Sequence, residues 1–226
     1  MNEVKIEYNT SESPTAPAFS EGTLRINTGD PTNATQFVEK IPLFTILPES
    51  KNSVLRLVAP EFDFNAVNDI NPTEFSSSMV ETCIKANGIG LAAPQCGFNI
   101  RMFVIGTENN YVAMFNPRIL ESSEQMVIME EGCLSFPNLY VSISRPKTVL
   151  IEYQNYKGIL QKVELDGLGA RCVQHELDHL DGVLYLSRAK PMALARAKTQ
   201  REKILRRIRK NERMATQHRN GNTSRN

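Results

Sequence analysis

The sequence predicts an α+β protein with one core. Helical patterns occur in three segments, and the strand-like runs between the first two are joined mainly by short connections that suit hairpins. The chain has 226 residues, which is the length of one domain with additional tails. We therefore expect helices and hairpin-linked strands that share a single core.

Residues 1–40 are rich in Ser, Thr, Pro, Asn and Glu, and their apolar residues follow no period. Such a segment cannot bury enough apolar surface to offset the entropy that it loses on ordering. We expect a disordered, polar N-terminal extension over residues 1–40 and a folded domain over residues 41–187. Residues 188–226 are expected to form a basic C-terminal helix with a disordered end.

The first predicted helix precedes Gly88, which is a plausible stop signal. Its apolar stripe consists of Phe75, Met79, Cys83 and Ala86. The strand-like runs that follow read IRMFVIG, YVAMFNP, QMVIMEEG, KTVLIEYQ and ILQKVELDG. A second helix is predicted from about Gly167 to Leu180, and a third from Pro191 to about Arg213.

Composition narrows the class of protein. No run of about 18 apolar residues occurs, so no segment is expected to span a membrane. The first twelve residues contain three glutamates and no apolar stretch, which argues against a signal or transit peptide. We expect a cytoplasmic protein whose four cysteines remain thiols.

Charge is distributed unevenly along the chain. Residues 188–226 contain thirteen Lys or Arg and two acidic residues, a net charge of +11, whereas the remainder carries −10. A basic tail attracts the phosphates of nucleic acids, although a helix with a solvated charged face would have the same composition.

The segment QHELDHL, residues 174–180, predicts a metal site. On a helix, His175 and His179 are four residues apart and lie on one face, so both rings can reach one ion. Glu176 lies about 100° round the helix and would reach a water beside the ion. A divalent ion lowers the pKa of such a water to roughly 7, and a carboxylate can take and return its proton. This combination is typical of a hydrolase.

A catalytic ion of this kind needs a third protein ligand. In metalloproteases with the pattern HExxHxxGxxH, it would be a histidine where this chain has Tyr185. In another common arrangement it would be a downstream glutamate, and the candidate, Glu202, lies in the basic tail. Neither pattern is complete. The alternative is an upstream cysteine, and the segment EGCLSFP contains one, Cys133.

At this point the chain resembles the peptide deformylase family, whose motifs are GxGLAAxQ, EGCxS and QHExDHL. The corresponding segments here are GIGLAAPQ at residues 88–95, EGCLS at residues 131–135 and QHELDHL. The resemblance covers about residues 42–187 and so implies a deformylase catalytic domain over residues 41–187. It implies a deformylase-like α+β fold with antiparallel or mixed sheets around a central helix that carries the HExxH motif, plus a C-terminal helix.

The resemblance also implies the activity, which is hydrolysis of the N-formyl group from the formylmethionine of nascent polypeptides with release of formate. Glu176 would be the general acid and base, and the Gln95 side chain and the Leu134 backbone N–H would stabilise the formyl oxygen. The implied metal ligands are Cys133, His175 and His179. Fe2+ is the implied working ion, and Ni2+, Co2+ or Zn2+ could occupy the site.

The substrate-binding residues implied by the resemblance are Gly88, Ile89, Gly90, Met129, Gly132, Leu168 and Cys172. A glycine lets the substrate backbone approach and pair as an added strand. Leu168 and Cys172 lie on nearly the same helix face as His175, where they would form part of an apolar pocket for the methionine side chain.

Two further features concern the surroundings of the pocket. Arg171 stands where the family usually has an apolar residue, so we expect a more polar rim. Glu131 and Arg145 occupy the places of a pair that would hold the Cys133 loop in position. If this pair were exposed, it would contribute little to stability.

The expected partners are formylmethionyl nascent peptides and, through the basic C-terminal helix, the ribosome. We expect a monomer with no membrane partner. Two other functions remain open. A metalloprotease would need a third His or Glu ligand, and an inactive RNA-binding relative would have lost a ligand, but none is missing here.

Overall fold

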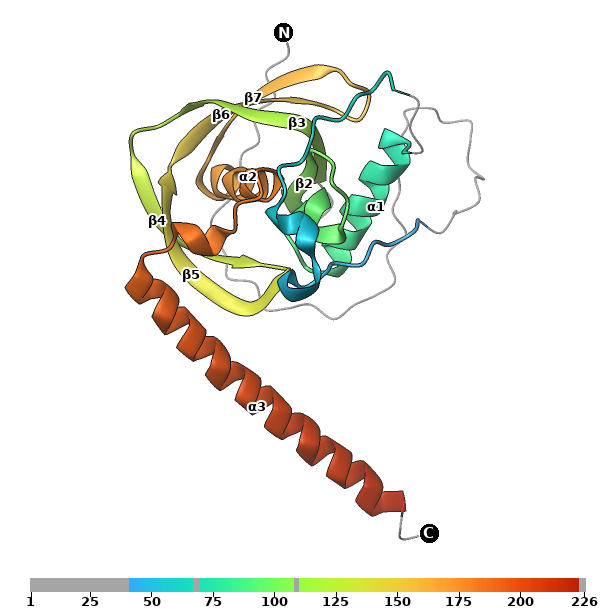
Figure 1. Cartoon of the computed structure of the whole chain (residues 1–226), viewed down its shortest axis with the longest axis vertical. Helices are drawn as coiled ribbons and strands as arrows, with labels where there is room; N and C mark the ends of the chain where they lie inside the picture. Colours follow the sequence, from blue (N-terminus) through green and yellow to red (C-terminus); the bar gives the residue numbers. More distant parts are fainter. Residues whose placement is uncertain (1–40, 67–69, 108–109, 224–226) are drawn as a thin grey trace.

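The computed structural model describes residues 41–66, 70–107 and 110–223, with side chains described as far as Ala215. The expected disorder of residues 1–40 therefore falls outside the described residues. Figure 1 shows a body of helices and sheets from which one long helix projects. The predicted α+β class is confirmed.

Two antiparallel sheets enclose helix α2 (Figure 1). The larger sheet has the strand order β1-β2-β3-β6-β7, and the smaller is the hairpin β4-β5. The strands are β1 Gly90–Ala92, β2 Met102–Thr107, β3 Asn110–Ser122, β4 Met126–Cys133, β5 Phe136–Pro146, β6 Thr148–Gln154 and β7 Leu160–Asp166. Because β1 is an edge strand, its outer side is not paired within this sheet.

Helix α2 spans Gly167–Leu180, as predicted, and twelve of its fourteen residues are buried. Its apolar side chains, including Val173 and Leu180, join Phe103, Ile105 and other residues of the larger sheet in one core cluster. Polar side chains at its remaining positions are thereby buried between the sheets. The metal-binding motif is consequently carried by the most enclosed element of the fold.

Helix α1 spans Pro72–Lys85. The Asn71 side chain accepts hydrogen bonds from the backbone N–H groups of Thr73 and Glu74, which caps the helix. Phe75, Met79 and Cys83 of the predicted stripe are buried in a second core cluster. After the helix, the N–H of Gly88 bonds to Cys83 O, and the chain enters β1.

Strand β5 was missed by the sequence prediction. Its apolar residues do alternate, with Leu139, Val141 and Ile143 buried. However, the next buried position on that face is Arg145, and Pro137 and Asn138 lie near the start. These residues interrupt the hydrophobic pattern that identifies a strand.

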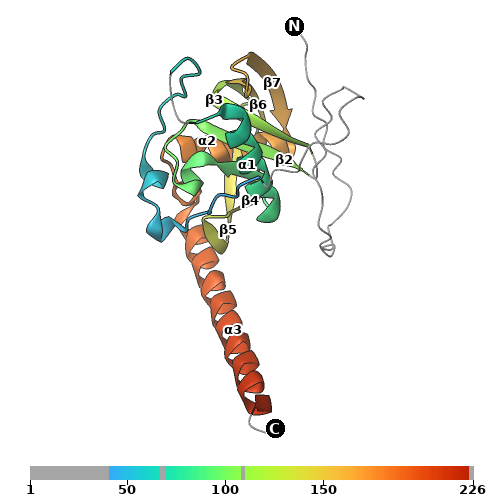
Figure 2. The ribbon, with the colours of Figure 1, turned by 90° about the vertical axis from the view of Figure 1, so that its right-hand side faces the viewer.

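Helix α3 spans Pro191–Thr223 and projects from the body (Figures 1 and 2). The predicted end near Arg213 is therefore wrong. Residues 214–219 include Met, Ala, Gln and Arg, which are good helix formers and can continue a helix without an apolar stripe. Its first turns pack Ala193 and Ala197 against a cluster that includes Phe136. Among the described residues, no helix is both long enough and apolar enough to cross a bilayer.

Candidate active site

The structure brings Cys133, His175 and His179 together. Their candidate ligand atoms all lie within 4.8 Å of one another, and Cys133 Sγ is 3.2 Å from His179 Nε2. Donors roughly 2.0 to 2.3 Å from one ion lie about 3 to 4 Å apart, so this group fits a tetrahedral metal with three protein ligands. Cys133 comes from the end of β4 and both histidines from α2, 42 residues or more further along the chain.

His175 is held by Glu131. Its Nδ1 lies 3.0 Å from Glu131 Oε2, so Nε2 is the nitrogen left for a metal. Burial alone would raise the pKa of Glu131, but hydrogen bonds from Arg145, His175 and Arg171 outweigh it and hold that pKa well below its usual range. Glu131 is therefore a carboxylate that fixes the orientation of the ring.

His179 is enclosed more deeply, with 1% of its surface exposed. Burial, reinforced by the nearby His175 and Arg145, lowers its pKa well below the usual value. The ring is therefore neutral, which is the form that binds metals. Its Nδ1 has no hydrogen-bond partner among the described residues.

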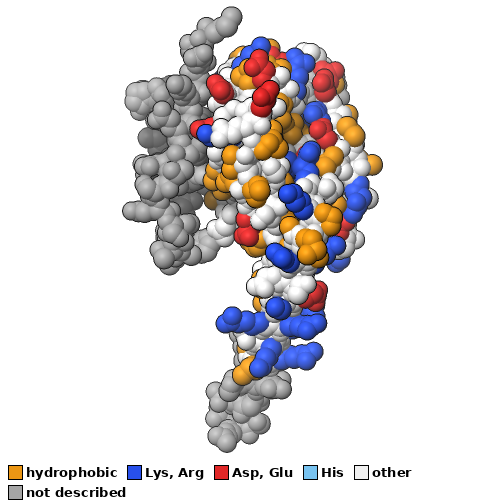
Figure 3. All heavy atoms as spheres, turned by 90° about the vertical axis from the view of Figure 1, so that its left-hand side faces the viewer, with side chains coloured by type: hydrophobic (Ala, Val, Ile, Leu, Met, Phe, Trp, Pro, Cys, Tyr) orange, Lys and Arg blue, Asp and Glu red, His pale blue; other side chains and the backbone are white. Residues whose placement is uncertain are grey.

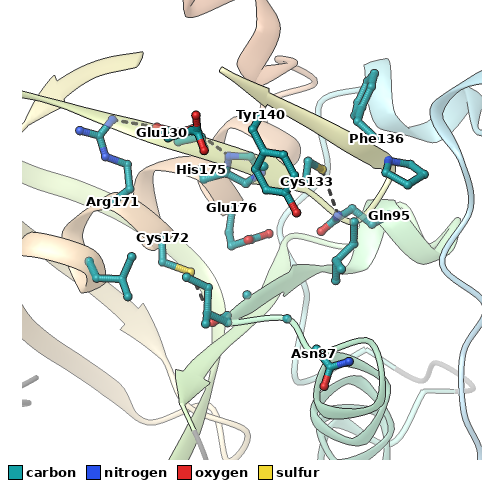
Figure 4. Close-up of a pocket in the computed structure, with 18 of the residues that line it drawn as sticks. Asn87, Gln95, Glu130, Cys133, Phe136, Tyr140, Arg171, Cys172, His175 and Glu176 are labelled. Atoms are coloured by element: carbon teal, nitrogen blue, oxygen red, sulfur yellow. Dashed lines mark hydrogen bonds and ion pairs between the residues drawn. The ribbon is translucent and has the colours of Figure 1, made fainter. Parts of the chain in front are cut away.

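Glu176 points into the same space (Figure 4). Burial raises the pKa of its carboxyl to about 7, although the neighbouring His175 opposes this effect. Oε2 is buried without a hydrogen-bond partner among the described residues, and such an atom costs about 1 to 3 kcal/mol when it stays unsatisfied. A carboxyl group in this state is suited to exchanging a proton with a water at neutral pH.

Gln95 is 1% exposed and has a defined orientation. Its Oε1 accepts a hydrogen bond of 2.8 Å from the Ala92 N–H, so its amide nitrogen faces Cys133 Sγ at 3.4 Å. The Asn52 side chain donates to the carbonyls of Pro94 and Gln95, which fixes the short helix that carries Gln95.

A cavity of about 460 Å³ opens over these groups. Most of the predicted substrate-binding residues line it, namely Gly88, Ile89, Gly90, Gly132, Leu168 and Cys172. Leu134, Gln95, Cys133, His175 and Glu176 also line it. Met129 does not, because it lies on β4 opposite Ile143, one step away from the cavity along its face of the strand. Its predicted contact with the substrate stays a prediction.

Several lining residues were not predicted. Glu130 and Phe136 flank the cysteine motif, and Tyr140 is 57% exposed at the cavity. Asn87, Pro137 and Asn138 also line it. Most of them lie within a few residues of Cys133 in the sequence, which is the signal that could have identified them. A hairpin that carries a metal ligand brings residues of both of its strands to the site.

The Glu131–Arg145 pair is present and buried. Arg145 Nε and Nη2 donate to the two oxygens of Glu131 at 2.6 and 2.9 Å, and Nη1 donates to Asp178 at 2.8 Å. Arg188, in the connection between α2 and α3, also binds Asp178. The guanidinium of Arg171 binds Glu131 as well. Arg171 lines the cavity, and its guanidinium is occupied within the protein. Its expected effect on the polarity of the pocket rim stays a prediction.

Tyr185, at the third-ligand position of the metalloprotease pattern, is not part of the metal group. Its hydroxyl donates to Leu139 O at 2.7 Å. Glu202 lies exposed on α3. All four cysteines are free, as expected.

A thiol and two imidazoles with a buried carboxyl beside them, at the base of a cavity between two sheets, define a metal-dependent hydrolase. The polypeptide deformylase family model matches residues 45–195, and the chain belongs to this family. Its activity is that of the family, namely metal-dependent removal of the formyl group from the N-terminal methionine of nascent polypeptides.

Individual relatives agree with this assignment. The chain is 51% identical over 113 residues to a peptide deformylase of Thermotoga neapolitana, a match that covers 50% of this chain and 69% of the relative. A crystal structure of peptide deformylase from Thermotoga maritima is similar with a TM-score of 0.62 and 40% identity, over 66% of this chain and 99% of that one. The crystal structure of a peptide deformylase from Synechococcus elongatus in complex with actinonin is similar with a TM-score of 0.65 and 33% identity. This match covers 73% of this chain and 90% of that one.

Proposed function

We propose that Cys133, His175 and His179 hold one divalent ion, Fe2+ in the working enzyme, which Ni2+, Co2+ or Zn2+ can replace. The observation that carries this proposal is the approach of the three donor atoms to within 4.8 Å beside the buried Glu176. A thiolate with two imidazoles suits these borderline ions. Such an ion supplies Lewis acidity, which makes water a nucleophile near neutral pH.

In the proposed reaction, Glu176 takes a proton from the attacking water and passes it to the departing amine. Negative charge develops on the formyl oxygen, and the Gln95 amide and the Leu134 N–H donate hydrogen bonds to it. Loss of one such donor typically raises the barrier by about 2.7 to 4 kcal/mol. The hydrogen bond that Gln95 Oε1 accepts from the Ala92 N–H supports this role, because it directs the amide nitrogen toward the site.

The substrate is proposed to enter as an extended peptide. Its backbone would add to the unpaired outer side of β1 near Gly90, since β1 is the edge strand of the larger sheet. Its methionine side chain would lie against Ile89, Leu168 and Cys172, which line the cavity.

Formate release from a formyl-Met peptide tests the activity, with protein purified anaerobically and loaded with one metal per chain. The wild-type chain should release formate, whereas the Glu176→Ala and Cys133→Ser variants should not. A loaded wild-type protein that releases none would refute the function.

We also propose that α3 contacts the ribosome and that the enzyme works as a monomer in the cytoplasm. Figure 3 shows Lys and Arg side chains gathered around the described part of α3. The basic residues exposed there include Arg206, Arg207, Arg209 and Lys210. Beyond its first turns the helix stands clear of the body, where it can reach a large partner (Figure 2).

Co-sedimentation with ribosomes tests this contact. We expect binding that weakens steeply as salt is raised, because phosphate contacts release counterions. Replacing Arg206, Arg207 and Lys210 by Gln should reduce both the affinity and the salt dependence. The matched control replaces three exposed lysines of the body, Lys51, Lys147 and Lys157. Equal effects of the two triple variants would count against a contact through α3.

A further inference from the structure

Arg171 joins three elements around the metal group. It lies on α2, four residues before His175, and is 5% exposed. Its Nη1 donates to Glu131 Oε1 at 2.8 Å and to Ile143 O at 3.0 Å. Its Nη2 donates to Val127 O at 2.6 Å. One guanidinium therefore fastens α2 to both strands of the β4-β5 hairpin.

The carboxylate of Glu131 is held from two directions. Arg145 approaches from β5 and reaches both of its oxygens, but also donates to Asp178 and to Gln174 O. Arg171 approaches from α2, and Glu131 is the acid that it binds. Since Arg145 is divided between two acids, Arg171 adds a second constraint on the plane of the Glu131 carboxylate.

The constrained carboxylate of Glu131 also binds His175. Arg171 binds Oε1 of Glu131, while Oε2 is the oxygen that faces His175 Nδ1 at 3.0 Å. In Figure 4, dashed lines at Arg171 and at His175 mark their bonds to the unlabelled Glu131. A fixed Oε2 determines the angle of the imidazole ring, and the ring angle determines where Nε2 points.

We propose that Arg171 is a positioning residue for the metal centre, which acts through Glu131 on the orientation of His175. This inference rests on the proposed role of His175 as a ligand. Two rival roles make different predictions. If Arg171 only fastened the hairpin, its loss would lower stability and leave metal affinity unchanged. If its charge acted on the substrate, its loss would change KM and leave metal affinity unchanged.

The test measures the dissociation constant for Co2+ by competition with a chelator, on refolded chains whose fold is checked by circular dichroism. Loss of a group that orients a ligand costs about 10- to 100-fold in metal affinity. Because Arg145 still holds Glu131, we expect Arg171→Met to weaken Co2+ binding about tenfold, at the low end of this range. Arg171→Lys should restore part of the affinity, since an ammonium can bind Oε1 but cannot span the carbonyls.

Arg101 provides the matched control. Like Arg171, it binds one acid, with Nη1 2.8 Å from Asp181 Oδ1, and it binds one carbonyl where Arg171 binds two, with Nη2 3.3 Å from Pro117 O. Neither the Asp181 carboxylate nor the Pro117 carbonyl is bonded to the side chain of a proposed metal ligand among the described residues. Arg101→Met should leave the Co2+ affinity unchanged. If Arg171→Met fails to fold, Arg171→Lys is compared with wild type in its place.

A double-mutant cycle with Glu131→Gln tests whether Arg171 affects the Co2+ affinity through Glu131 or independently of it. If Arg171 acts through Glu131, adding Arg171→Met to Glu131→Gln should cause little further loss of affinity. Fully additive losses, or an Arg171 variant that folds and binds Co2+ as tightly as wild type, would overturn the inference. A wild-type chain that does not bind one Co2+ would instead refute the proposed metal site.

Discussion

Glu176 occupies the space that Gly90 leaves by having no side chain. A Cβ built on Gly90 would lie 2.4 Å from Glu176 Oε1 and 2.6 Å from Cys172 Sγ. Both of these atoms are buried in α2, so neither can easily move away. The edge of β1 and the proposed catalytic carboxyl are thus in direct contact.

Gly90→Ala should therefore impair the reaction. A displacement of Glu176 by about 1 Å can cost on the order of 100-fold, and we expect kcat/KM for formate release to fall by about this factor with metal content unchanged. The controls are the metal content of the variant and its fold, which circular dichroism checks. A Gly90→Ala enzyme that folds, binds the metal and is as active as wild type would contradict the prediction.

Glu176→Gln tests the proton transfer itself. The amide keeps the shape of the side chain but cannot accept a proton, so kcat should fall about 10²- to 10⁴-fold while the chain still binds one metal ion. Metal analysis and formate release on the same sample check both parts. Asp181→Asn, at the exposed end of the same helix, should leave kcat unchanged. Loss of the metal from Glu176→Gln would make Glu176 a ligand and not a base.

Cys133→Ser should lower the metal affinity, because a hydroxyl is a poorer ligand than a thiolate for the proposed ions. The thiolate-to-metal absorption of the Co2+ form should also disappear. Cys96→Ser is the control, since Cys96 lies outside the metal group and burial raises its pKa to about 12. If both variants kept the absorption band, Cys133 would not be the sulfur ligand.

Glu131→Gln should destabilise the metal-free chain. The change leaves the buried guanidiniums of Arg145 and Arg171 without the carboxylate that they share, and breaking a buried ion pair costs about 3 to 5 kcal/mol. Urea unfolding measures the loss. Glu81→Gln, which breaks the helical pair with the exposed Lys85, should cost about 0.5 kcal/mol or less. Similar losses in the two variants would show that the buried network contributes little.

The local parts of this molecule were predictable from the sequence. Helix α2 matched its predicted bounds because its motif and its ends are adjacent in the chain. The spacing of His175 and His179 places both rings on one helix face by geometry alone. The joining of Cys133 to them is a contact over more than forty residues, which no local pattern specifies, and it was expected only from the resemblance to deformylases.

The features that the sequence did not specify depend on long-range contacts. The acceptors of Arg171 include carbonyls of β4 and β5, so its direction could not be inferred from α2 alone. Strand β5 was missed because Arg145 replaces an apolar residue at a buried position, where Glu131 and Asp178 compensate its charge. Which residues of β4 line the cavity also depends on the fold, since Glu130 lines it and the adjacent Met129 does not.

The bond between Arg188 and Asp178 has a mechanical consequence. Arg188 leads into α3, Asp178 is the immediate neighbour of His179, and further along α3 the Arg201 side chain bonds to Pro137 O at the rim of the cavity. With 33 residues, α3 is about 50 Å long. These contacts fix the direction of α3 relative to the cavity. A partner that binds the far part of α3 would therefore hold the cavity opening at a set distance and in a set orientation.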